Sequence, residues 1–166
     1  MKEERRNLGE SLMRNVSEWY DMAETQNRIG AFLVGDDLDL TKRWGVLAGS
    51  LFIVIFIFYL FDYYQTVYAL IPGRVIVYGA AGILVLLSAW QAYQNRSLVA
   101  SLLLCIAPVT ALFIHIIGEG QIDNPGVGET LILGIGWGLA FGVPLGVLGF
   151  ILGYAGQRFI DSEIPT

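Results

Sequence analysis

Residues 130–157 read TLILGIGWGLAFGVPLGVLGFILGYAGQ, a stretch of 28 residues without a formally charged side chain. A helix needs about 20 mainly apolar residues to cross the hydrocarbon core of a bilayer. Glycine recurs every three or four residues, which places most of these glycines on one slowly drifting helical face. A face without side chains lets a neighbouring helix approach closely. The stretch therefore predicts a membrane-spanning helix that packs tightly through glycine.

The predicted packing face leaves open which helix it contacts. Its members are Gly134, Gly138, Gly142, Gly146, Gly149 and Gly153. The face is expected to pack on the first or second span of the same chain, to form a seam with another copy or another subunit, or to line a pore. Pro144 in this stretch and Pro108 in the third span each remove a backbone donor, so both are candidate hinges.

Three further stretches without formal charge precede this one, at residues 44–61, 75–95 and 97–118. We expect spans at about 44–64, 75–95, 97–117 and 130–154, the first extended by aromatic residues after Asp62. Backbone groups left unpaired in lipid are costly, so helices are the expected form, and the runs do not alternate as barrel strands do. The predicted fold class is all-α: a polytopic membrane protein with a four-transmembrane-helix bundle and an N-terminal amphipathic helix.

The charge distribution supports a membrane protein. Hydrophobic residues make up 55% of the 166 and charged residues 15%. Nine of the fifteen acids and seven of the ten bases lie in residues 1–43. The net charge of −5 argues against a nucleic-acid partner, which would need a basic surface. Arginine outnumbers lysine eight to two, and with the acidic balance this suggests a halophilic archaeon as the source.

Basic residues near the span ends predict the orientation. Lys42 and Arg43 precede the first span, Arg96 lies between the second and third, and Arg158 follows the fourth. Arg74 is the exception. We therefore expect a multi-pass protein of the cell membrane with both termini cytoplasmic, including a short tail at residues 158–166.

Residues 3–27 carry apolar side chains at helical spacing, opposite a charged face. The apolar positions are Leu8, Leu12, Val16, Trp19, Tyr20 and Ala23. They predict an amphipathic helix, followed by an acidic linker up to residue 43. This helix is expected either to lie on the membrane surface or to dock on a cytoplasmic partner; its polar face is mixed rather than basic, which favours docking.

Few groups with reactive chemistry occur outside residues 1–43. A polar cluster is possible at the outer face, made of Asp62, His115, Glu119, Asp123 and Glu129. With one histidine in the chain, no Ser/His/Asp set and no metalloprotease pair can form, and no glycine run is followed by the lysine of a phosphate loop. We predict no catalytic, metal-binding or cofactor-binding residue. Ser88, Ser101 and Thr110 are the mid-span hydroxyls of note, and each can bond its own helix backbone.

Three functional hypotheses remain. The leading one is a non-enzymatic subunit or scaffold of a membrane assembly, which packs through the glycine face of the fourth span. The second is a small oligomeric channel or transporter, and the third is a membrane enzyme acting on lipids. The expected partners are the lipid bilayer, further copies or other membrane subunits, and a cytoplasmic partner for residues 3–27.

Overall fold

The computed structural model describes residue 30 and residues 32–118 and 126–163. Within this part of the chain every regular element is a helix. The labelled helices are α2 (Leu38–Leu60), α3 (Tyr63–Leu70), α4 (Gly73–Asn95), α5 (Leu98–Ile116) and α6 (Val127–Glu163). Four segments are long and apolar enough to cross a membrane: Phe32–Leu60, Gly73–Asn95, Leu98–Ile116 and Val127–Phe159. The predicted all-α, four-span architecture is confirmed; the predicted helix at residues 3–27 lies outside the described residues.

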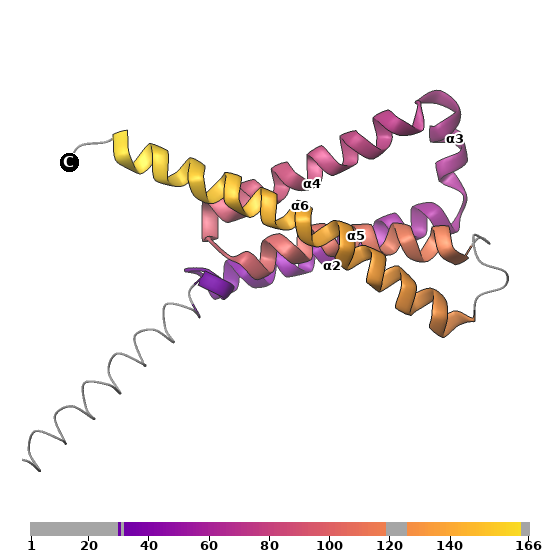
Figure 1. The fold of residues 1–166 in the computed structure, drawn as a ribbon, viewed down its shortest axis with the longest axis horizontal. Helices are drawn as coiled ribbons and strands as arrows, with labels where there is room; N and C mark the ends of the chain where they lie inside the picture. The colour runs from indigo at the N-terminus through magenta and orange to yellow at the C-terminus, as the bar shows by residue number, and fades with distance from the viewer. Residues whose placement is uncertain (1–29, 31, 119–125, 164–166) are drawn as a thin grey trace, which may run out of the picture.

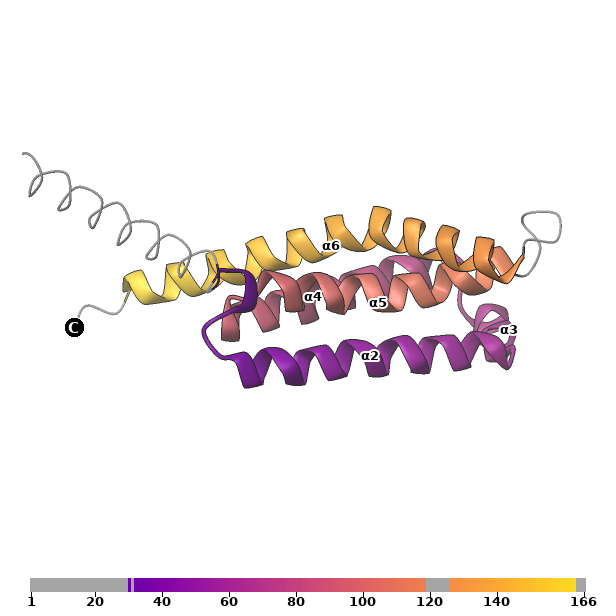
Figure 2. The same ribbon diagram turned by 90° about the horizontal axis from the view of Figure 1, so that it is seen from below.

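Helix α5 is the centre of the bundle. It is the most apolar of the four spanning helices. In its most apolar stretch of 18 residues, 44% of the residues are buried inside the protein, against 11–22% in the other three. It packs mainly against α2 and α6, which lie on opposite sides of it (Figure 2), and less extensively against α4. Helix α4 packs chiefly on α6.

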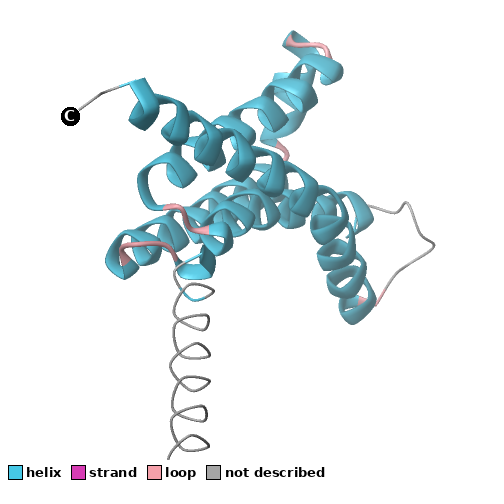
Figure 3. Ribbon diagram, turned by 60° about the vertical axis from the view of Figure 1, so that its left-hand side comes forward, coloured by secondary structure: helices cyan, strands magenta, loops and turns pink. Residues whose placement is uncertain are grey.

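The bundle has two different ends (Figure 1). Residues 30–37, the α4–α5 turn and the last turns of α6 lie at one end, which we call the terminal end. The α2–α3 junction, the end of α5 and the start of α6 lie at the other, which we call the loop end. From the terminal end, α4 diverges from α2, and α3 bridges the gap between them. Figure 3 shows short loops between α2, α3, α4 and α5.

The glycine face of α6 contacts two helices in succession. The ideal Cβ position at Gly134 lies 2.5 Å from an Ile114 side-chain atom, and that at Gly142 lies 2.6 Å from Ile106 Cα. The same positions at Gly138 and Gly146 meet Thr110 and residues 101–102 of α5, whereas those at Gly149 and Gly153 meet α4. The partners of this face are therefore the third and second spans, not the first, because α6 crosses from α5 to α4 along its length.

Helix boundaries differ from the expected spans at three points. Helix α2 begins at Leu38, where the Asp37 carboxylate accepts hydrogen bonds from two backbone N–H groups of the first turn. It ends at Leu60, because Asp62 adopts the left-handed conformation with φ of 56° and starts the separate helix α3. Helix α6 continues past residue 154, since a helix can extend into water beyond the bilayer.

Candidate functional site

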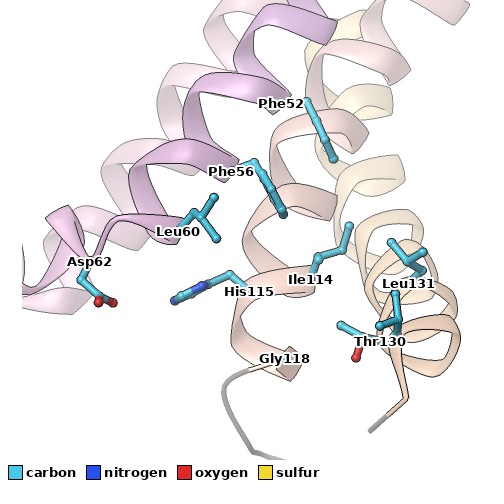
Figure 4. A pocket seen from close by; sticks show the side chains of 10 residues that line it. Phe52, Phe56, Leu60, Asp62, Ile114, His115, Gly118, Thr130 and Leu131 are labelled. Atoms are coloured by element: carbon cyan, nitrogen blue, oxygen red, sulfur yellow. The ribbon is translucent and has the colours of Figure 1, made fainter.

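An open pocket of about 630 Å³ lies between α2, α5 and α6 at the loop end (Figure 4). We call it the loop-end pocket. Most of its lining is apolar, with three polar side chains among it. The lining residues are Phe52, Phe56, Leu60, Asp62, Ile114, His115, Gly118, Val127, Thr130 and Leu131. The volume falls within the roughly 300–1,000 Å³ typical of small-molecule sites.

Helical spacing explains how this lining arises. Phe52, Phe56 and Leu60 recur every four residues, which places them on one face of α2. The opposite wall comes from the first turns of α6, where Thr130 and Leu131 lie. The polar residues come from the helix ends, which is why they gather at the mouth of the pocket while the aromatic rings form its deeper wall.

His115 lies in an aromatic environment at this mouth. Its ring centroid is 4.9 Å from that of Tyr59 and 5.2 Å from that of Tyr64. The hydroxyls of Tyr59 and Tyr68 lie 3.5 Å apart. Figure 4 shows His115 reaching from α5 toward the end of α2, where Asp62 lies. Aromatic residues of α2 and α3 therefore hold the imidazole at the loop end.

The structure places part of the predicted outer cluster here. Asp62 and His115 line the same pocket, and Glu129 is exposed in the first turn of α6, next to Thr130. Glu119 and Asp123 lie outside the described residues. No group of three or more His, Cys, Asp or Glu side chains that could hold a metal occurs in the described part of the chain. Asp62, His115 and Glu129 therefore provide hydrogen-bonding groups and negative charge at the mouth of an otherwise apolar pocket.

A second site, which the sequence reasoning missed, is centred on Asn95 at the terminal end. Its Nδ2 donates to the Asp37 carbonyl at 2.9 Å and to Thr41 Oγ1 at 2.6 Å. Its Oδ1 accepts the Asp37 N–H at 2.7 Å, and its carbonyl accepts the Asp36 N–H at 3.2 Å. Asn95 is 1% exposed. One buried amide thus fastens the start of α2 to the end of α4.

The same contact extends to the residues before α2. Ser97 is fully buried, and its Oγ donates to the Leu33 carbonyl at 3.2 Å. Phe32 meets the Phe150 ring edge-on at 5.3 Å. Gly35 has φ of +90°, and a Cβ there would collide with the Asn95 carbonyl, so only glycine fits. We call these contacts of residues 32–41 with Asn95, Ser97 and Phe150 the terminal clamp.

A third polar cluster is buried between α4, α5 and α6. Ser88, Gln91 and Ser101 are all fully buried. Ser88 Oγ donates to the Gly146 carbonyl at 3.2 Å, and Ser101 Oγ lies 2.6 Å from Gln91 Oε1. These two serines therefore bond neighbouring helices and not their own helix backbones. The Gln91 Nε2 group has no hydrogen-bond partner among the described residues.

The two prolines lie within continuous helices. Pro108 is buried inside α5, and Pro144 is exposed inside α6. Membrane helices tolerate proline where neighbouring groups satisfy the freed carbonyl. Their role as hinges stays a prediction.

The chain was also compared with known proteins. No protein-family model, no curated protein and no solved structure matches it.

Proposed function

We propose that this chain is a non-enzymatic scaffold or subunit of a membrane assembly, which presents its N-terminal region at one surface of the bilayer. The observation that carries the proposal is the terminal clamp. Four hydrogen bonds of Asn95 hold the residues at the start of α2. A protein that only had to be anchored in the membrane would not need the segment before α2 to be fixed on the bundle by buried hydrogen bonds.

The packing of α6 supports a role for the N-terminal region in contacts with other proteins. The glycine face of α6 is covered by α5 and α4, so it is not open to a second copy. Residues 3–27, with an apolar face and a mixed polar face, are the segment best suited to dock on a partner. The clamp would set the direction in which this segment leaves the bundle.

The orientation of the chain belongs to the same proposal. Lys42, Arg43, Arg96 and Arg158 belong to the elements that meet at the terminal end. Basic residues are retained on the cytoplasmic side of membrane proteins. We therefore place the terminal end, and both chain termini, in the cytoplasm.

The test is the mass and composition of the tagged, full-length protein extracted gently from its own membrane. A second protein at fixed ratio is the expected result. Replacing Leu12 and Trp19 together by glutamine should remove it, whereas the control Glu18→Gln, on the charged face, should retain it. A homo-oligomer of defined size that persists in the double variant would overturn the proposal and favour the channel or transporter.

A further inference from the structure

The loop-end pocket has the form of a site for one lipid molecule. Its wall on α2 runs from Phe52 to Leu60, which is a rise of about 12 Å along the helix axis. The hydrocarbon core is about 30 Å thick, so this depth is close to that of one leaflet. The polar residues of the pocket lie at its outer mouth, at the level where a lipid headgroup would lie.

The pocket is also open to the side, where lipid would enter. Leu60 is 59% exposed and Leu131 is 44% exposed, although both line it. A transmembrane helix of another protein is a poorer fit. Such a helix is 10–12 Å wide and would need a continuous surface across the bilayer, whereas this pocket is confined to the loop-end turns of α2, α5 and α6.

The charge at the mouth selects the headgroup. Asp62 lines the pocket, Glu129 lies beside the lining residue Thr130, and both carboxylates are exposed. None of the described lining residues is lysine or arginine, and the described basic residue at this end, Arg74, lies on α4, which is not one of the pocket walls.

We propose that the loop-end pocket binds one lipid of the adjacent leaflet, with a hydrocarbon chain along the α2 wall and a protonated amine in the headgroup near Asp62. The site is independent of the scaffold role proposed above, because it uses none of the clamp residues. It is also independent of which leaflet faces the loop end. Thr130, which also lines the pocket, supplies a hydroxyl that can donate a hydrogen bond to a phosphate oxygen of such a lipid.

The experiment uses the purified full-length protein, exchanged into mixed micelles of phosphatidylethanolamine and phosphatidylglycerol in equal amounts. Native mass spectrometry then counts the lipids retained on each protein. We expect one retained lipid, with the amine-bearing lipid favoured by about fivefold, as for one exposed charge interaction. Retention of no lipid above background, or preference for phosphatidylglycerol, would overturn the proposal.

Paired variants separate the pocket from the rest of the lipid-facing surface. Leu131→Trp fills the pocket and should lower occupancy at least about fivefold, whereas Ile132→Trp should not, since Ile132 is 73% exposed and lies outside it. Phe56→Ala removes part of the pocket wall and should also lower lipid occupancy. This second variant keeps the test valid if the Leu131→Trp protein does not fold. Its control is Ile57→Ala, at a position outside the pocket. Equal occupancy within both pairs would exclude the site.

A headgroup variant tests the amine. Asp62→Asn removes the charge and keeps the backbone, because asparagine tolerates the left-handed conformation seen at this position. It should retain one lipid but lose the preference between the two headgroups. An unchanged preference would show that Asp62 does not select the headgroup and would refute that part of the proposal.

Discussion

Replacing Gly142 by alanine tests how closely α6 approaches α5. An added Cβ would lie 2.6 Å from Ile106 Cα and 2.9 Å from its backbone nitrogen. Carbon atoms in ordinary contact lie about 3.5–4.0 Å apart. Neither backbone atom can rotate away, so the two helices must separate locally by about 1 Å. That separation also disturbs the neighbouring contacts of Gly138 and Gly146 with α5.

The cost follows from the strain of overpacking. Adding a methyl group to a well-packed interior costs about 1–3 kcal/mol in the free energy of unfolding. For a chain of this length each kcal/mol lowers Tm by about 2–4 °C, so the strain of Gly142→Ala taken alone should lower Tm by about 2–12 °C. Alanine also has a higher helix propensity than glycine, by about 1 kcal/mol, which partly offsets the strain.

Gly136→Ala is the matched control. Gly136 lies on the same helix, and its added Cβ would meet nothing within 4 Å. This variant should therefore unfold at the wild-type temperature or above it, because only the propensity term changes. The assay is thermal unfolding of the purified full-length proteins in one detergent, followed by circular dichroism. If both variants unfold at the same temperature, the close approach of α6 to α5 is wrong.

Three further outcomes are expected. Asn95→Ala should lower the free energy of unfolding, measured by chemical denaturation, by about 1–3 kcal/mol, because it leaves buried hydrogen-bonding groups without their partner. The control Gln94→Ala, at an exposed position, should change this free energy little. Gln91→Met should change it by less than about 1 kcal/mol in the same assay, because the lost hydrogen bond from Ser101 Oγ is offset by removal of a buried amide nitrogen that has no partner among the described residues. On intact cells a membrane-impermeant maleimide should label the Thr66→Cys variant but not the Asp39→Cys variant, because α3 lies at the end of the bundle opposite the start of α2. The native Cys105 is buried and should not react. Labelling of Asp39→Cys instead would show that the chain has the opposite orientation.

The four spans were predictable because each is a long apolar run without charge, and the hydrocarbon core sets the length that such a run must have. The glycine spacing also predicted close packing of α6. It did not predict the partners, since a bare helical face fits any neighbour with a compatible surface. Here Gly142 meets α5 and Gly149 meets α4, a change of partner that depends on the crossing of the helices.

The polar sites were harder to predict, because their residues are far apart in sequence. Asp37 and Asn95 are separated by 58 residues, and so are Ser88 and Gly146. A signal was present: Ser88, Gln91 and Asn95 recur at steps of three and four, which places polar side chains on one face of an otherwise apolar helix. Only the packing shows that their partners lie on three other elements.

The two ends of the bundle have different physical properties, and the two proposals follow from this difference. At the terminal end, buried hydrogen bonds from Asn95 join elements that already pack closely, which suits an end that must hold the N-terminal region in a fixed direction. At the loop end, α4 has diverged and a pocket remains between α2, α5 and α6, which leaves room for lipid. From Thr41 to Leu60, α2 rises about 28 Å, and sites so far apart act independently unless a shared element couples them. Asn95→Ala should therefore weaken retention of a protein partner while lipid occupancy at the loop end stays unchanged; loss of both would mean that α2 transmits the disturbance along its length.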